Sequence, residues 1–413
     1  MRIPFLLLFC FSLSTIWSQT MVVKARSYLD VTSGLLAAPA VVLIKDGLIE
    51  AINPPSIPAD AIEVNLEDQT LLPGLIDMHT HLTLDLEDMG MALRETAADW
   101  ALRGAKNAKI TLMAGFTTVR DVGSNGFSDV ALSKAINKGY VEGPDIFPSA
   151  HAIGITGGHM DRTGFAPGVA EEDYRSGVAD GPNDLMKATR YQIKHGAKVI
   201  KIGATAGVLS FEGPVGAQQL TQAEMEAVVE EANRHGIRVA AHSHGKEGML
   251  AAVRAGIHSV EHGSMIDDEV IAAMKENGTY LVPTTYIPYG INWDKLPPIM
   301  VKKGKTVSSV TEVNIAKAIK AGVKLAFGTD AGVYPHGDNA KEFSILVKLG
   351  LSPLEAIRGA TIYATDLLGV ADRGVIAVGK KADIIGLNGN PLEDVTLLEK
   401  VAFVMKSGKV VKR

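Results

Sequence analysis

The sequence predicts an α/β fold, a (β/α)8 barrel of the TIM type with a small composite β-sandwich domain built from both termini. Six segments with a helical pattern end at a glycine, and a short apolar run follows each of them. The junctions are Ala114-Gly115, His195-Gly196, His235-Gly236, Ala255-Gly256, Asn277-Gly278 and Ala321-Gly322. A glycine just past a helix supplies the left-handed cap. The β-branched runs that follow are typical of strands buried on both faces, and strands that alternate with helices predict a parallel sheet.

Residues 71–370 are close in length to one such barrel. Its strands are expected at residues 75–78, 117–121, 146–151, 199–202, 239–242, 258–261, 280–283 and 325–328. Capping boxes predict helix starts at Thr221 and Ser352. An open, doubly wound sheet is the alternative, but no glycine-rich phosphate loop follows the first strand to favour it.

The flanking residues 19–70 and 371–413 carry short strand patterns. Turns are expected at residues 45–47 and 406–408, and a further short strand at residues 374–376. Neither end is long enough to make an adequate sheet alone, so we expect one β domain formed from both.

Residues 1–18 resemble a signal peptide. Arg2 gives a positive start, residues 3–13 are apolar, and Ser18 suits the last position before cleavage. A spanning helix needs about 20 apolar residues, so we expect a secreted or periplasmic chain with no stable membrane insertion after processing. A buried N-terminal strand and a lipid anchor at Cys10 are the alternatives. Cys10 is the one cysteine, so the processed chain would hold no disulfide and no thiolate ligand.

The charge balance argues against nucleic acid as a partner. The formal net charge is −5 and no block of basic residues occurs.

Two histidines end the first predicted barrel strand. His79 and His81 follow an apolar run, and residues two apart in an extended strand face the same side. Two imidazoles on one face form a chelating pair for zinc-like metals, whereas the alternative is two unrelated surface histidines.

Lys201 lies inside a β-branched run, where a bare ammonium group needs a partner. A protonated lysine cannot bind a cation, but reaction with CO₂ would convert it to an anionic carbamate. The alternative is an ordinary ion pair with a buried carboxylate.

Three more candidates stand at later strand ends. His242 and His262 each come six residues after a helix-ending glycine, and Asp330 follows the last predicted strand. A core histidine is the alternative for either imidazole. Asp121 is similarly placed, and Arg120 beside it is its candidate partner.

This order of residues resembles the amidohydrolase superfamily: His-x-His after strand one, Lys on strand four, His on five and six, and Gly-Thr-Asp on eight. The segments 72–81 and 379–383 add to the resemblance. The similarity is greatest to the imidazolonepropionase-like and Xaa-Pro or Xaa-Lys/Arg dipeptidase branch, which includes secreted ochratoxin-hydrolysing amidases.

The resemblance implies a site with two divalent metal ions, expected to be Zn²⁺. His79, His81 and Asp330 would hold one ion, His242 and His262 the other, and carboxylated Lys201 would bridge both. A hydroxide between the ions would attack an amide carbonyl, and Asp330 would carry the proton to the departing nitrogen. Deaminase-type relatives place a glutamate after the fifth-strand histidine; Ser243 and His244 stand here instead and disfavour that reaction.

The expected substrate is a small molecule or short peptide with a free carboxylate, cleaved at the amide bond before its C-terminal residue. His159 and Arg162 follow the third strand in a glycine-rich segment and are the cationic candidates for that carboxylate, although Arg162 could simply pair with Asp161. Tyr286, or alternatively Tyr289, is the candidate for the scissile carbonyl oxygen, and His244 is a further substrate-binding candidate.

The alternatives in function are a lactonase, an imidazolonepropionase-type cyclic amide hydrolase, and a non-catalytic exported metal- or solute-binding barrel. We expect a homo-oligomer.

Overall fold

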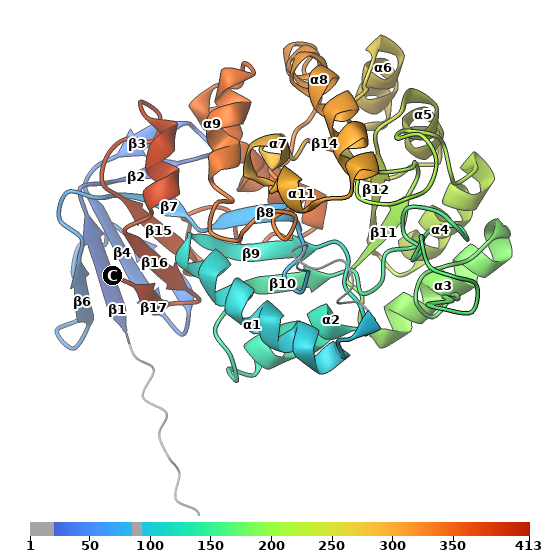
Figure 1. Cartoon of the computed structure of the whole chain (residues 1–413). Coiled ribbons are helices and arrows are strands. Elements are labelled where there is room, and N and C mark those ends of the chain that lie inside the picture. Colours follow the sequence, from blue (N-terminus) through green and yellow to red (C-terminus); the bar gives the residue numbers. More distant parts are fainter. Residues whose placement is uncertain (1–19, 85–92) are drawn as a thin grey trace, which may run out of the picture.

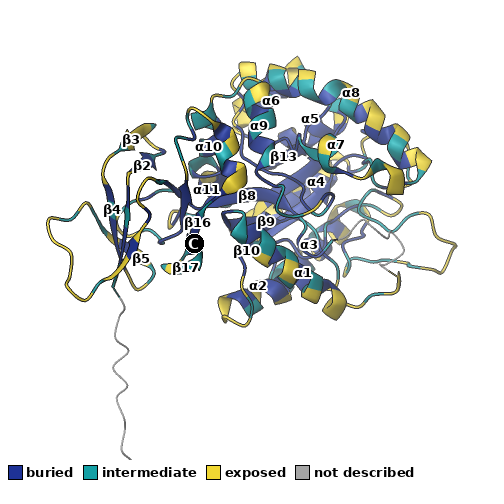
Figure 2. Ribbon diagram, turned by 60° about the vertical axis from the view of Figure 1, so that its left-hand side comes forward, coloured by how far each residue is buried: buried dark blue, intermediate teal, exposed yellow. Residues whose placement is uncertain are grey.

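The computed structural model describes residues 20–84 and 93–413. A body of strands surrounded by helices makes up the larger part of the molecule, and two sheets lie to one side of it (Figure 1). The inner strands are buried, whereas the outer faces of the surrounding helices are exposed (Figure 2). The predicted leader, residues 1–18, lies outside the described residues. Within the described ranges, no helix is long and apolar enough to cross a membrane.

The strands of the larger body form two parallel sheets. One has the order β10-β9-β8, from β8 (Leu75–Thr80), β9 (Phe116–Asp121) and β10 (Asp145–Pro148). The other has the order β11-β12-β13-β14, from β11 (Val199–Gly203), β12 (Arg238–Ser243), β13 (Ser259–His262) and β14 (Tyr280–Val282). The expected strand at residues 146–151 is therefore shorter, ending at Pro148. Isolated parallel bridges, Ile153 with Ile202 and Leu281 with Leu325, link the segments between and beyond these sheets.

The eighth expected strand, residues 325–328, is not a regular strand. The amide of Ala326 donates to Leu281 in β14, but the amide of Phe327 donates to Gly359 O at the end of α10 (Pro353–Gly359). The amide of Met78 in β8 donates back to Phe327 O at 2.9 Å. The segment thus contacts both sheets. Its backbone amides donate partly to a strand and partly to the end of a helix, so one continuous eight-stranded sheet is not formed.

Helices cover the outside of these sheets. Those that alternate with the strands or follow them are α1 (Ala97–Met113), α2 (Ser128–Asn137), α3 (Gly181–His195), α4 (Gln222–Arg234), α5 (Lys246–Arg254), α6 (Asp268–Asn277), α7 (Ile287–Gly290), η2 (Trp293–Lys295), α8 (Pro298–Lys320), α9 (Lys341–Lys348), α10, α11 (Ile362–Leu368) and η3 (Val395–Lys400). All six glycines at the predicted junctions have positive φ, which explains why glycine stands there. Thr221 caps α4 with the predicted box, and Ser352 accepts the Glu355 amide at the start of α10.

Strands from both ends of the chain share one sheet. Its order is β17-β16-β15-β7-β2-β3, from β2 (Ser27–Asp30), β3 (Leu35–Ala37), β7 (Thr70–Pro73), β15 (Ile384–Leu387), β16 (Phe403–Lys406) and β17 (Lys409–Lys412). A second sheet, β5-β4-β1-β6, is formed from β1 (Met21–Ala25), β4 (Ala40–Lys45), β5 (Leu48–Ile52) and β6 (Ile62–Asn65). Residues of the two sheets, among them Val23, Ile44, Ile384 and Phe403, pack in one hydrophobic cluster.

The two predicted turns face each other. Asp46 and Gly47, and likewise Ser407 and Gly408, all have positive φ, as a two-residue hairpin turn requires. The Ala382 amide donates to Gly47 O, and the Gly408 amide donates to Ala382 O. Residues 374–376 form no strand, contrary to expectation.

A cluster of charges joins the C-terminal segment to the parallel sheet. The Asp145 carboxylate, at the start of β10, contacts Arg373 Nη1 at 2.8 Å, Lys381 Nζ at 2.7 Å and Lys406 Nζ at 2.8 Å. Burial raises the pKa of Asp145, but the three cations outweigh burial and hold that pKa well below its usual range.

Candidate active site

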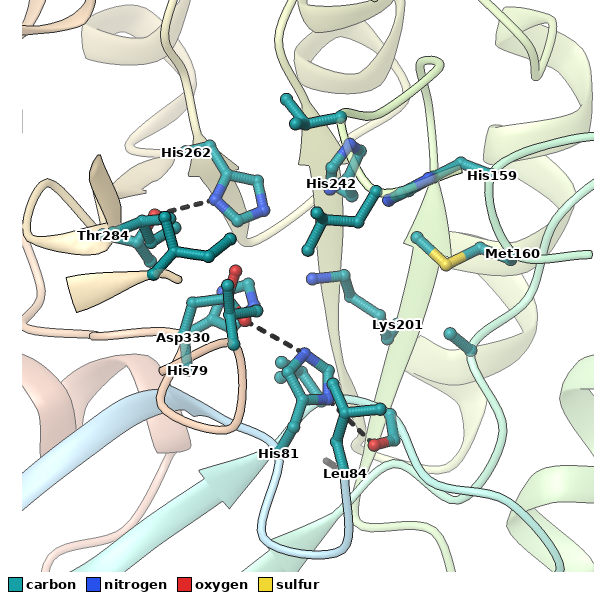
Figure 3. Close-up of a pocket in the computed structure, with 18 of the residues that line it drawn as sticks. His79, His81, Leu84, His159, Met160, Lys201, His242, His262, Thr284 and Asp330 are labelled. Carbon is teal, nitrogen blue, oxygen red and sulfur yellow. Dashed lines mark hydrogen bonds and ion pairs between the residues drawn. The ribbon is translucent and has the colours of Figure 1, made fainter. Parts of the chain in front are cut away.

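The predicted ligand side chains meet at the carboxyl ends of the parallel strands. His79 comes from β8, Lys201 from β11, His242 from β12 and His262 from β13, and all point into one space (Figure 3). His81 and Asp330 enter it from the segments after β8 and after residues 325–328. The fold therefore brings together six side chains that lie far apart in the sequence, between positions 79 and 330.

Two groups of side chains are close enough to hold a metal ion. Their ligand atoms lie within 4.8 Å of one another, in the sets His242, His244, His262 and His79, His262, Asp330. The Oδ1 atom of Asp330 lies 3.5 Å from His79 Nε2 and 3.3 Å from His81 Nε2. His244 thus joins a histidine group, a position that the sequence did not predict for it.

Two of these atoms are buried without a hydrogen-bond partner among the described residues: His242 Nε2 and Asp330 Oδ1. A buried polar atom without a partner is costly, and a bound cation would satisfy both atoms. Neutral imidazoles with a carboxylate are a donor set that suits zinc-like divalent metals. The residues present therefore fit a divalent metal ion.

The Nδ1 atoms of three of the imidazoles lie within hydrogen-bond distance of surrounding residues. His79 Nδ1 lies 2.7 Å from Glu261 Oε2, His81 Nδ1 lies 2.9 Å from Gly123 O, and His262 Nδ1 lies 2.7 Å from Thr284 Oγ1. Assigning the proton to Nδ1 satisfies each contact and leaves Nε2 as the inward lone pair.

Glu261 and Arg120 form a buried pair beneath His79 that the sequence did not predict. Arg120 Nη2 donates to Glu261 Oε1 at 2.7 Å, and its other nitrogens donate to Met78 O and Ser259 Oγ. The proposed pairing of Arg120 with Asp121 is wrong, because successive strand residues face opposite sides. Asp121 instead accepts from the Leu82 amide at 2.9 Å. The sequence did offer one signal for this pair. Glu261 is a charged residue within a buried strand, directly before His262, and such a residue needs a partner.

A second missed carboxylate supports His262. Glu342 of α9 accepts from the amide and hydroxyl of Thr285 and from the amide of Tyr286, at 2.6–2.8 Å. These bonds hold the segment that carries Thr284, the partner of His262.

Three non-glycine residues of the site have left-handed backbone: His262 with φ 70°, Thr284 with φ 50° and Asp330 with φ 63°. Such conformations are unfavourable for β-branched and bulky residues and cluster at functional sites.

The lysine of the site is almost fully buried, with 3% of its surface exposed. Lys201 forms no ion pair with any residue in the described ranges, so the ordinary ion-pair alternative is wrong. Burial lowers its pKa to about 8, although Glu261 and Asp330 oppose that shift. The neutral amine is therefore accessible near neutral pH.

Four histidines of the site are held in their neutral form. Burial is the main cause that lowers the pKa of His79 to about 4 and of His244 to about 3, and it takes the pKa of His242 and His262 well below the usual value. Burial also acts on His81, but Asp330 outweighs it and the pKa of His81 is raised.

The site opens into a pocket of about 400 Å³. Apolar side chains make up much of its wall: Leu84, Trp100, Met160, Val208, Leu209, Ile287, Ile291, Trp293, Val307 and Val333. Of the predicted substrate residues, His159 and His244 line this pocket.

Arg162 and Tyr286 do not line the pocket. Arg162 Nε pairs with Glu172 at 2.8 Å, and the Arg162 backbone amide donates to Asp161 Oδ1 at 2.7 Å. The Tyr286 ring lies against Tyr334, with centroids 5.1 Å apart. Tyr289 is exposed, and its hydroxyl bonds Glu312. These long side chains follow the strands after which they were expected, but they contact residues outside the pocket.

The chain matches known proteins over almost all of its length. The profile of the Amidohydrolase family matches residues 70–411. An ochratoxinase of Aspergillus niger is 35% identical over 375 residues, covering 83% of this chain and 75% of that protein.

Two solved structures are similar throughout. A Xaa-Pro dipeptidase with methionine bound in its active site superposes with a TM-score of 0.91 at 36% identity, covering 96% of this chain and 100% of the other. A prolidase complexed with N-methylphosphonate-L-proline gives a TM-score of 0.86 at 32% identity, with the same coverage. The likeness confirms the predicted family branch and implies an α/β fold of the TIM-barrel type.

Proposed function

The chain belongs to the amidohydrolase family, and on that premise we propose that it hydrolyses the amide bond before a C-terminal residue, in dipeptides or N-acyl amino acids. It is a hydrolase that acts on amide bonds. The observation that carries the proposal is the convergence of His79, His81, His242, His262, Lys201 and Asp330 at the base of a pocket with apolar walls.

The proposed metal centre holds two divalent ions, expected to be Zn²⁺. His79, His81 and Asp330 would hold one, and His242 and His262 the other. When bound, such ions polarise a carbonyl and lower the pKa of water. Lys201, as its carbamate, would be a ligand to both: the neutral amine adds to the carbon of CO₂, an N–C bond forms as one C=O π bond breaks and its electron pair moves to oxygen, and the nitrogen releases one proton.

In the proposed reaction the chain's own residues position the substrate and move the proton. Asp330 accepts a proton from the attacking water and returns it to the leaving nitrogen. His159 and His244, which line the pocket, hold oxygen atoms of the substrate. The apolar wall receives an aliphatic or aromatic acyl group and excludes water from the reacting bond.

We also propose the division of the chain into a hydrolase barrel at residues 71–370 and a composite β domain from residues 19–70 and 371–413. The sheet that unites β2, β3 and β7 with β15, β16 and β17 supports it. Export and homo-oligomer formation are further proposals. N-terminal sequencing of protein expressed with its native leader, and light scattering of the purified protein, test them; a first residue near Gln19 is expected.

A screen of dipeptides and N-acyl amino acids against the zinc-loaded enzyme, followed by liquid chromatography, tests the reaction. Free-acid substrates should be cleaved, and their C-terminal amides should have a strongly raised KM. His159→Ala should remove that difference. Turnover of lactones or cyclic amides alone would contradict the proposal, and bound metal with no turnover on the whole panel would favour a binding protein.

A further inference from the structure

One wall of the pocket is built around the indole ring of Trp293. Trp293 lies in η2, between the short helix α7 and the long helix α8, and it lines the pocket together with Gly304 of α8. The ring is half-buried, so part of its surface is left to the pocket. The rest of it packs against one hydrophobic cluster, formed by Ile291, Leu296, Met300 and Val333.

The glycine beside this ring has no backbone reason to be there. Gly304 stands in the interior of α8 with ordinary helical backbone and without a positive φ. Glycine in a helix interior is unfavourable relative to alanine, because it loses more conformational freedom on folding. Its presence therefore needs an explanation from packing.

The Trp293 ring occupies the space that a side chain at position 304 would fill. A Cβ atom on Gly304 would lie 2.3 Å from Cζ3 and 2.4 Å from Cη2 of Trp293. Val208 Cγ1, at 3.5 Å from the same point, bounds this space on another side. Any larger residue at position 304 would have to displace the ring or the helix.

The other end of the indole ring is held by a hydrogen bond. Trp293 Nε1 donates to Pro288 O at 3.1 Å. This nitrogen is the one donor of the side chain, so the surface that the ring presents to the pocket is apolar. Aromatic rings pair in offset-stacked or edge-to-face arrangements, and such a surface therefore suits a flat hydrocarbon group.

We propose that Trp293 and Gly304 determine the size and shape of the apolar group that the pocket accepts on the acyl side of the substrate. The Trp293 ring is the surface against which a bulky, flat group packs. Gly304 is a positioning residue that leaves room for this ring. The part that concerns the acyl group rests on the proposed function.

A neutral aromatic probe tests the wall without turnover. Naphthalenemethanol has no carboxylate and no amide, and equilibrium dialysis against the metal-loaded protein measures its Kd. Trp293→Leu should weaken binding about 3- to 10-fold, as for the loss of one aromatic contact, and Trp293→Phe should lose less. Gly304→Ala should also weaken binding, because the added Cβ displaces the ring. A wild-type Kd in Trp293→Leu would overturn the proposal, and a wild-type Kd in Gly304→Ala would overturn the role of Gly304.

The double variant separates positioning of the ring from stability of the helix. If Gly304 acts through Trp293, Gly304→Ala should weaken probe binding in the wild-type background and not further in Trp293→Leu. In Trp293→Leu the added Cβ has room, so alanine should raise Tm by about a degree, whereas in the wild-type background it should not. An equal loss of probe binding in both backgrounds would refute the coupling.

Val313→Ala is the matched control. It removes an apolar side chain of α8 that is 72% exposed and does not line the pocket, so the Kd of the probe should stay as in wild type.

The effect on substrate choice is measured with N-naphthoyl and N-acetyl derivatives of one amino acid. Trp293→Leu and Gly304→Ala should each lower the preference for naphthoyl over acetyl, as the ratio of kcat/KM, about 3- to 10-fold. The loss should arise mainly from a raised KM for the naphthoyl substrate. An equal fall of kcat/KM for both substrates would overturn the role in selecting the acyl group.

The two measurements distinguish failure of this inference from failure of the proposed function. Probe binding that depends on Trp293, in a protein that cleaves no amide, would refute the proposed function and leave the aromatic wall standing. Cleavage with an unchanged acyl preference in Trp293→Leu would refute the wall and leave the proposed function standing.

Discussion

Nδ1 of His79 lies 2.7 Å from Oε2 of Glu261, and both side chains are almost fully buried. The Glu261 carboxylate is held on its other oxygen by Arg120, so it can accept from His79 without rotating. This relationship fixes the tautomer of His79 and directs Nε2 toward Asp330.

Glu261→Gln should therefore weaken metal binding by about 10- to 100-fold, because outer partners of ligand histidines control their orientation and basicity. Metal retained after dialysis against a series of chelators measures the effect. Glu230→Gln, at an exposed helix position, is the control and should retain metal as wild type does. Unchanged retention in Glu261→Gln would show that packing alone orients His79.

Lys201→Ala should lower the metal content of replete protein from about two ions per chain, because a bridging ligand is lost. Elemental analysis gives the count, and a short carboxylic acid such as propionate should restore part of the activity. Lys198→Ala removes a neighbouring lysine at the start of the strand and should keep both ions. A full complement of metal in Lys201→Ala would refute the carbamate bridge.

Asp330→Asn should lower kcat by about 10²- to 10⁴-fold with a smaller effect on KM, because the amide keeps the shape but cannot accept the proton. Steady-state kinetics with one good free-acid substrate, together with the metal content, measures both effects. Asp268→Asn, on the exposed start of α6, should behave as wild type. Near-normal turnover would assign the proton transfer to another group, with His244 the first to test.

Asp145→Asn should lower Tm by several degrees at pH 7 and by less at pH 3. The folded pKa of Asp145 lies below its unfolded value of about 3.9, so its contribution is complete above that pH and declines as the pH falls through the folded pKa. Removing the carboxylate leaves Arg373, Lys381 and Lys406 without their shared partner, at a cost of about 3 kcal/mol.

Thermal unfolding at the two pH values measures this difference. Asp338→Asn, which breaks the exposed pair with Lys341, should change Tm little at either pH. An equal loss of stability at pH 3 and pH 7 would show that packing, and not charge, is the contribution of Asp145.

The sequence alone predicted the order of helices and strands, because those signals are local. Helix-ending glycines, capping boxes and β-branched runs act within a few residues, and the structure has positive φ at all six junction glycines. The ligand candidates could be named for the same reason: each stands at the end of a strand-like run, and parallel strands end at one edge. In residues 325–328 and 374–376 the local signals were weak, and a regular strand was wrongly expected in each segment.

The tertiary structure decided which side chains meet. Arg120 pairs with Glu261, 141 positions away, and not with its neighbour Asp121. His159 lines the pocket while Arg162, three residues later, pairs with Glu172. Long side chains on loops can reach several partners, and the choice depends on burial and charge contributed by segments distant in sequence, which periodicity does not encode.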